Sequence, residues 1–233
     1  MLIKNNSSNF AFDALFANFP IMKKIIPIVV ILLTFSSCIE VIEEIHINDD
    51  KSGSLSYRLE SSQIGFLLNK LSKVFDATIE DQLQEKVKEF ANLLKQQEGI
   101  NKIEFTSDPN SMDYELYCEF ADSKKLNTAL YKVFGYKKNI LTPSYLKVSN
   151  HKVKKINFSP MLKDYLRDEE IEIPSEYLSG LIYFKSLVYL PMKVKNATGT
   201  QVEIIDDKNL VNQTFKLTDV IENKVNVGVK IKY

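Results

Sequence analysis

Histidines and carboxylates are the side chains of this chain best suited to moving protons. The sequence of 233 residues holds two histidines, His46 and His151. A histidine that acts as a general base needs a nucleophile or an orienting carboxylate within hydrogen-bond reach. His46 follows Glu43 and Glu44 on an expected strand, and His151 lies beside Asn150 in an expected turn. Both settings favour exposed strand or loop residues over catalytic ones.

Three pairs of adjacent acidic residues raise the possibility of glycoside cleavage, which uses two carboxyl groups. The pairs are Glu43-Glu44, Glu169-Glu170 and Asp206-Asp207. Adjacent residues on a strand point to opposite faces, so sequence neighbours rarely form such a pair. We therefore expect solvated turns and edges. The chain also carries no G-x-S-x-G, H-E-x-x-H, P-loop or dinucleotide motif, so the sequence predicts no catalytic residue and no cofactor site.

Oxygen-bearing residues cluster at residues 48–54, where Asn48, Asp49, Asp50, Ser52 and Ser54 could approach a cation. A calcium loop would place a bidentate glutamate near its end, and the next glutamate falls too late and across an expected hairpin. A solvated turn is the better interpretation, and we predict no metal site.

Two cysteines, Cys38 and Cys118, are too few for a disulfide framework or a cysteine-based zinc site. Cys118 lies in the alternating run YELYCEF, which favours a small core residue. Cys38 lies at the end of a different pattern. Lys23 and Lys24 precede an apolar run over residues 25–35, and Ser36 and Ser37 then lead into Cys38.

This order of charge, apolar run, small residues and cysteine resembles a bacterial lipoprotein signal peptide. The run is about half of the roughly 20 residues that cross a bilayer. The resemblance implies a signal peptide over residues 22–37, and a mature chain that begins at Cys38 with acyl chains as its membrane anchor. A buried N-terminal element and an uncleaved membrane anchor remain as alternatives.

Residues 1–21 do not fit a signal peptide, because Asp13 and a second apolar patch precede the basic pair. We expect translation to start at Met22 and residues 1–21 to be a spurious extension. Residues 38–233 are then long enough for a single domain, although a division near residue 140 stays open.

The charge balance excludes some partners. Lysine plus arginine and aspartate plus glutamate each number 30, and the basic residues are spread along the chain. No basic tract predicts binding to nucleic acid or, apart from the anchor, to anionic lipid. Arginine occurs only at Arg58 and Arg167, which also argues against recognition of phosphate or carboxylate groups through its planar fork.

The coarse elements predict an α+β fold with a largely antiparallel sheet and helices on one face. Residues 41–47 and 54–59 should pair around a turn in which Gly53 takes positive φ, with Leu55, Tyr57 and Leu59 on one face. Residues 62–98 should form one long helix or two in series, broken near Thr78 and ended by Gly99. The remaining expected elements are a hairpin of 101–106 with 113–120, a helix over 124–134 capped by Asp122, extended runs over 144–148 and 153–158, a helix over 160–167, strands over 181–194, 202–205, 211–215 and 225–233, and a helix over 218–222.

An apolar helical stripe and a group of aromatic residues could each either bind a partner or form part of the core. The apolar stripe from Ile64 to Leu94 is expected to cover the sheet, with a partner-binding or dimerising helix as the alternative. The aromatics Tyr177, Tyr183, Phe184 and Tyr189 fit a half-buried strand, or else a groove for a glycan or lipid.

The chain from Cys38 onward resembles uncharacterised lipoproteins of Bacteroidota, of the flavobacterial type. The resemblance lies in CIEVIEEIHIND with DKSGSLSYRL, the Leu-Asn-x-Ala-Leu run at residues 126–130, Tyr189-Leu190-Pro191, and TQVEIIDDKNLVNQTFKL. It implies a location and a fold but no chemistry.

Together these patterns predict a non-enzymatic envelope lipoprotein, a binding or scaffolding module tethered to the outer membrane on its periplasmic or surface side. An envelope protein is the expected partner, and nucleic acid is not. A carrier or sensor for an apolar or polymeric ligand in a groove between helix and sheet is the alternative. An enzyme with an unrecognised site is a third hypothesis.

Overall fold

The computed structural model describes residues 39–61, 78–108, 113–135, 142–168, 182–205, 207 and 209–233. The chain divides into two compact units, Met1–Ser37 and Cys38–Tyr233, and every described residue belongs to the second unit. The expected extension, the signal peptide, the cysteine at its end, and the predicted helical segment over residues 62–77 lie outside the described residues.

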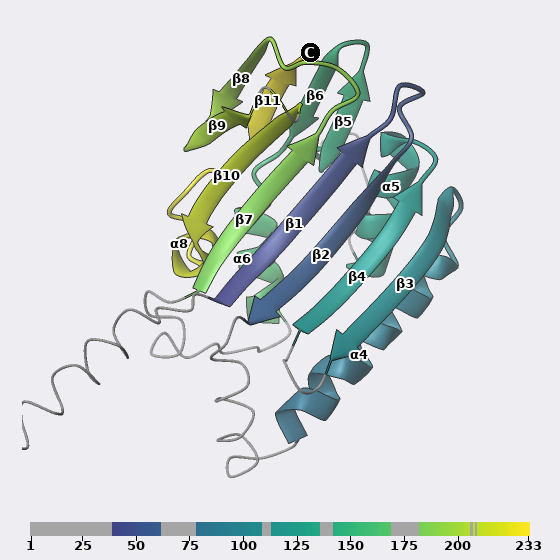
Figure 1. Cartoon of the computed structure of the whole chain (residues 1–233). Helices are drawn as coiled ribbons and strands as arrows, with labels where there is room; N and C mark the ends of the chain where they lie inside the picture. The colour runs from purple at the N-terminus through teal and green to yellow at the C-terminus, as the bar shows by residue number, and fades with distance from the viewer. Residues whose placement is uncertain are drawn as a thin grey trace, which may run out of the picture. The chain divides into compact units, whose positions relative to one another are not determined.

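A seven-stranded sheet forms the largest layer, and its strands run in the order β3-β4-β2-β1-β7-β10-β9 (Figure 1). The central strand β1 pairs antiparallel with β2 and parallel with β7, whereas the other neighbours in this sheet are antiparallel. The strand bounds are β1 Ile39–Ile47, β2 Gly53–Ser61, β3 Ile100–Asp108, β4 Asp113–Phe120, β7 Ile182–Tyr189, β9 Val202–Ile205 and β10 Leu210–Lys216.

A second, four-stranded antiparallel sheet packs on the large one in the order β5-β6-β11-β8. Its strands are β5 Leu146–Ser149, β6 Lys152–Lys155, β8 Asn196–Gly199 and β11 Val229–Lys232. Figure 1 shows this small sheet near the end of β1 that is opposite to Ile39. The predicted α+β class and the mainly antiparallel pairing are confirmed. A second sheet and a parallel β1–β7 pair were not predicted.

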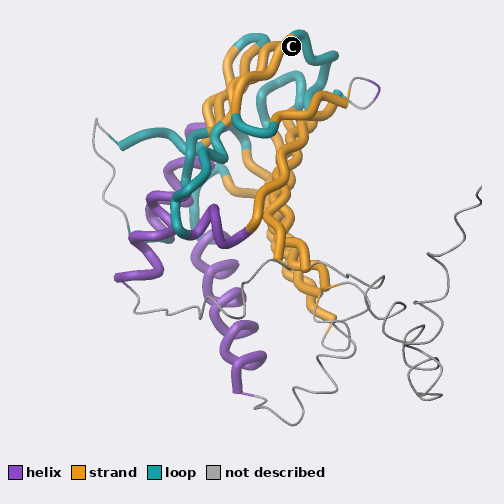
Figure 2. The backbone as a smooth tube through the Cα atoms, turned by 90° about the vertical axis from the view of Figure 1, so that its left-hand side faces the viewer, coloured by secondary structure: helices purple, strands orange, loops and turns teal. Residues whose placement is uncertain are grey.

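The described helices lie on the same side of the large sheet as the small sheet, and no described element covers the other side, which we call the open face (Figure 2). This confirms the prediction that helices cover one face. They are α4 Thr78–Lys95, α5 Ser123–Val133, α6 Ser159–Asp168 and α8 Leu217–Ile221. Among these described helices, none is long and apolar enough to cross a membrane.

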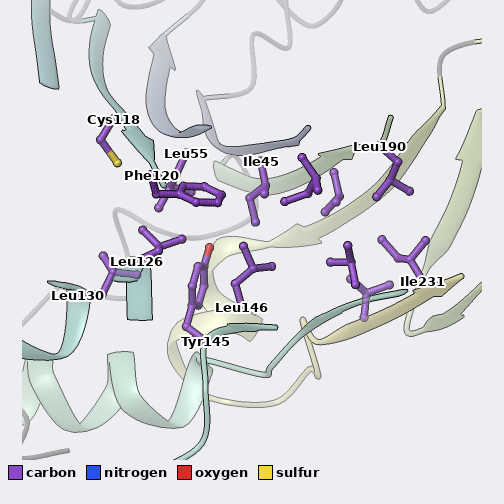
Figure 3. Close-up of a cluster of buried hydrophobic side chains, with 14 of the residues drawn as sticks. Ile45, Leu55, Cys118, Phe120, Leu126, Leu130, Tyr145, Leu146, Leu190 and Ile231 are labelled. Carbon is purple, nitrogen blue, oxygen red and sulfur yellow. The ribbon is translucent and has the colours of Figure 1, made fainter. Parts of the chain in front are cut away.

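The main core fills the space between the covered face of the large sheet, α4, α5 and the small sheet (Figure 3). Its side chains follow the alternation of the strands, so that Ile45 and Leu55 point inward, as predicted for Leu55. Leu126 on α5 and Ile231 on β11 meet them from the opposite layer. Cys118 is a free, buried core residue, as its strand pattern predicted.

The start of α5 agrees with its predicted cap. The carboxylate of Asp122 accepts hydrogen bonds from the backbone N–H groups of Lys124 and Lys125 at 2.7 and 2.9 Å, which fixes the start of α5. The described part of α4 starts at Thr78 and ends at Lys95, short of the predicted end at residue 98, and Gly99 follows in the turn with φ +78°.

Three local predictions were wrong. Positive φ in the first hairpin falls on Lys51 and not on Gly53, which is already part of β2. Gly53 is needed for space, because a Cβ there would come within 2.1 Å of the carbonyl oxygen of His46. The strands predicted over 181–194 and 225–233 are shorter, since β7 ends before Pro191, which has no N–H to donate, and β11 begins at Val229.

Candidate functional site

A row of polar side chains crosses the covered face of the large sheet. Glu43 on β1 lies opposite Tyr57 on β2 and Ser186 on β7, and Ser186 lies opposite Gln213 on β10. Residues that pair across strands share a face, so the register alone gathers these groups. Lys155 reaches the row from β6 of the small sheet.

Glu43 is the centre of this network. Its Oε2 is paired with the Lys155 ammonium and accepts a hydrogen bond from Ser186 Oγ at 2.7 Å. Its Oε1 accepts hydrogen bonds from the hydroxyls of Tyr145 at 2.6 Å and Tyr57 at 3.0 Å. Lys155 Nζ also donates to Ser186 Oγ at 2.6 Å. The carboxylate is therefore fully hydrogen-bonded.

Burial and charge shift the titration of this cluster. Burial favours the neutral form of Glu43, but the Lys155 charge and the hydrogen bonds outweigh it, so the pKa of Glu43 is lowered. Burial, together with the charge of Glu43, raises the pKa of Tyr57 and Tyr145 well above the usual range. The ion pair and neutral phenols are thus the stable state at neutral pH.

A serine beside a lysine can act as a nucleophile with its base, and Ser186 and Lys155 have this geometry. Here, however, both side chains of the Lys155–Glu43 pair are 0% exposed, and Ser186 is 1% exposed. A lysine that is paired with a carboxylate has no free lone pair for a serine proton. The cluster is best explained as a polar link between the two sheets. The expected solvated position of Glu43 was wrong, whereas its separation from Glu44 onto the opposite face is confirmed.

The open face of the large sheet carries two shallow hollows, of about 570 and 610 Å³. Both are lined by Arg58 and Glu115, so they adjoin over β2 and β4. Seven carboxylates line them, against one arginine: Glu40, Glu44, Glu60, Asp108, Asp113, Glu115 and Glu119. Arg58 pairs with Glu44 at 2.8 Å. These linings are rich in carboxylates, and none of the buried network residues is among them.

The predicted site residues do not converge. His46 bonds Glu44 at 2.7 Å and stacks on Tyr189 with ring centres 4.2 Å apart, on the open face, whereas His151 lies in the β5–β6 turn with φ +56°. Asp50 accepts hydrogen bonds from Ser52, as in an ordinary turn.

The aromatic residues of β7 divide between the two faces. Phe184 is buried in a cluster with Phe215, while Tyr189 lies on the open face beside His46. They form a half-buried strand and do not line one common groove. Tyr177, Glu169 and Glu170 lie outside the described residues.

Comparisons with known proteins add a loose likeness only. No family model and no curated protein matches the chain. Among solved structures, the chain is similar to the NMR structure of the folded domain of LppM from Mycobacterium tuberculosis, with a TM-score of 0.37 and 11% identity over 84% of this chain and 91% of that one. A TM-score of this size does not establish a common fold, so it decides nothing about this chain.

Proposed function

We propose that this chain is a lipid-anchored, non-enzymatic protein of the cell envelope, a binding or scaffolding module held in the outer membrane through Cys38. One observation carries the proposal. Strand β1 begins at Ile39, the residue directly after Cys38, and the compact unit to which it belongs starts at Cys38. The folded unit thus starts at the residue where the signal pattern predicts the mature chain to start.

The position of β1 determines how a lipid anchor at Cys38 would be joined to the domain. β1 is the central strand of the seven-stranded sheet, bonded along its length to β2 on one side and β7 on the other. An acyl group on Cys38 is therefore joined to the most interior strand of the sheet without an intervening linker. A binding face on this domain stays close to the membrane, which suits a module that holds an envelope component in place.

The binding role is supported by the arrangement of polar groups. The cluster with catalytic residue types, Glu43, Lys155 and Ser186, is sealed inside the protein. Polar groups that a partner can reach include those on the open sheet face, around hollows that overlap at Arg58 and Glu115. The carboxylates that line these hollows support a polar partner in preference to the apolar ligand of the carrier hypothesis.

Metabolic labelling of the producing cells with a palmitate analogue tests the anchor. We expect label on the wild-type protein and none on Cys38→Ala. The matched control is Cys118→Ala, which removes the other cysteine and should label like wild type, because Cys118 is buried in the core. Equal labelling of wild type and Cys38→Ala would show that Cys38 is not the lipid attachment site.

A further inference from the structure

The outward face of the small sheet carries five exposed lysines, which we call the lysine face: Lys147, Lys152, Lys154, Lys230 and Lys232. They alternate along β5, β6 and β11 with side chains that point into the core, such as Val153 and Ile231. The four strands of this sheet, LKVS, KVKK, NATG and VKIK, contain no acidic residue.

The register places these lysines in two rows. Lys154 lies directly opposite Lys147 on one side and Lys230 on the other, and Lys152 lies opposite Lys232. Residues opposite one another have Cβ atoms about 5 Å apart, and like charges in such positions destabilise a sheet.

Within the described part of the chain, no carboxylate forms an ion pair with any of the five lysines. The sheet therefore carries an uncompensated repulsion. A local arrangement that disfavours folding in this way is expected where function requires it.

We propose that the lysine face binds a linear anionic polymer that carries phosphate or carboxylate groups. Adjacent strands are about 4.8 Å apart, so a chain laid across β5, β6 and β11 meets Lys147, Lys154 and Lys230 at regular short intervals. Lysine is a flexible point charge, whereas arginine imposes a planar fork. An all-lysine row therefore suits a flexible polyanion. This inference rests on the binding role proposed above and does not depend on the anchor.

The other outward side chains of the small sheet favour a polymer over a membrane surface or a single-stranded nucleic acid. Ser149, Asn196 and Thr198 share the rows with the lysines and are small and polar. Membrane-surface segments combine basic residues with large apolar or aromatic ones that enter the lipid, and the outward positions of these four strands carry none, since their apolar residues point into the core. Single-stranded nucleic acids are bound by aromatic stacking, which these strands do not offer either.

Negative charge on the open sheet face should direct a polyanion to the lysine face. Seven carboxylates and one arginine line the hollows there, while the chain as a whole has a formal net charge of zero. A polyanion is repelled from the open face and attracted to the lysine face. The zero net charge thus conceals a separation of charge between two faces.

Fluorescence anisotropy of labelled inorganic polyphosphate and of labelled polygalacturonate, titrated with the detergent-solubilised full-length protein, tests the proposal. Lys147→Gln/Lys154→Gln/Lys230→Gln should weaken binding by about tenfold to a hundredfold, since it removes three of the five positive charges that face the polymer. The matched control, Lys88→Gln/Lys124→Gln/Lys163→Gln, makes the same charge change at exposed helix positions. It should bind within about threefold of wild type.

Thermal unfolding of the same variants keeps the result interpretable. The row variant should melt no lower than wild type, because it removes cross-strand repulsion. Polymer binding that is equally strong in the row variant and wild type, or equally weakened in the control, overturns the proposal. So does binding to phosphatidylglycerol vesicles that depends on the row when neither polymer binds. Cys38→Ala should retain polymer binding, so a failure of the anchor and a failure of the lysine face give different results.

Discussion

Replacing Lys155 with methionine should destabilise the protein in a way that depends on pH. Methionine keeps an unbranched apolar side chain beside Phe158 and Phe184, over which the ammonium now lies at 5.7 Å from each ring centre. The substitution therefore removes charge with little loss of packing. What remains is Glu43, a carboxylate that is 0% exposed and has lost its cation.

The size of the stability loss is set by the cost of protonating Glu43. Without Lys155 the carboxyl group can take up a proton and keep its tyrosine and serine neighbours as hydrogen-bond partners. For a carboxyl group of ordinary pKa 4.5, protonation at pH 7 costs about 3.4 kcal/mol. We expect Lys155→Met to lower the free energy of unfolding by about 3 kcal/mol at pH 7, or about 10 °C in melting temperature.

The same reasoning fixes the pH dependence. At pH 5 the protonation cost falls to about 0.7 kcal/mol, so the difference between wild type and Lys155→Met should shrink by about 2 to 3 kcal/mol. Urea unfolding at the two pH values measures both free energies. Lys154→Met, on the neighbouring exposed position of β6, is the matched control and should not lower the free energy of unfolding by more than about 0.5 kcal/mol, since it also relieves repulsion from Lys147 and Lys230.

Adding Glu43→Gln to Lys155→Met should recover at least about 2 kcal/mol at pH 7, because an amide needs no cation and no proton. A Lys155→Met cost below about 1 kcal/mol, or a cost that is the same at pH 5 and pH 7, would refute the reasoning. The double variant would then show no recovery, and the cluster would not link the two sheets electrostatically.

Three further predictions follow from the described contacts. The pKa of Glu43 is lowered on folding, so its contribution to stability is present above about pH 4.5 and is lost as the pH falls through its pKa in the folded protein. Acid unfolding followed by circular dichroism should therefore show a steeper loss of stability for wild type than for Glu43→Gln/Lys155→Met. Cys118 is buried and its pKa is raised to about 11, so a chromogenic thiol reagent at pH 8 should react with the native protein about a hundredfold more slowly than with the unfolded protein. After unfolding, the lipidated chain should show one reactive thiol and not two, because Cys38 carries the lipid. Asp122→Ala removes the cap of α5 and should lower the free energy of unfolding, measured in urea, by about 1 kcal/mol. Asp122→Asn can still accept the capping hydrogen bonds and should retain most of that stability.

Local signals predicted the elements well, because their causes are local. Asp122 caps α5 through the backbone N–H groups of Lys124 and Lys125, and Gly99 adopts positive φ in the turn between α4 and β3. Alternation placed Leu55 and Cys118 in the core. Each of these outcomes depends on residues within a few positions, so a single sequence contains the whole cause.

Features that depend on strand pairing could not be predicted in the same way. Glu43 looked like a solvated edge residue because its partner, Lys155, follows 112 positions later and reaches it only when the two sheets pack. The lysines of β5, β6 and β11 looked evenly spread, since Lys154 and Lys230 become neighbours only through the β6–β11 register. Non-local pairing is invisible to periodicity, and it created both the buried cluster and the lysine face.

Strand β1 connects the two proposals. It starts beside the expected lipid attachment site, and Glu43 lies four residues further on, about 13 Å along the strand. There Glu43 holds Lys155, the residue next to Lys154 of the lysine face, and Figure 1 shows the small sheet extending beyond that point, away from Ile39. A buried ion pair thus joins the sheet that carries the lysine face to the strand that follows the proposed anchor. The link is rigid because both partners are fully buried and hydrogen-bonded, which a flexible tether could not provide. A protein built in this way can hold an anionic polymer at a set distance from its anchor, and that is the mechanical requirement of a scaffold.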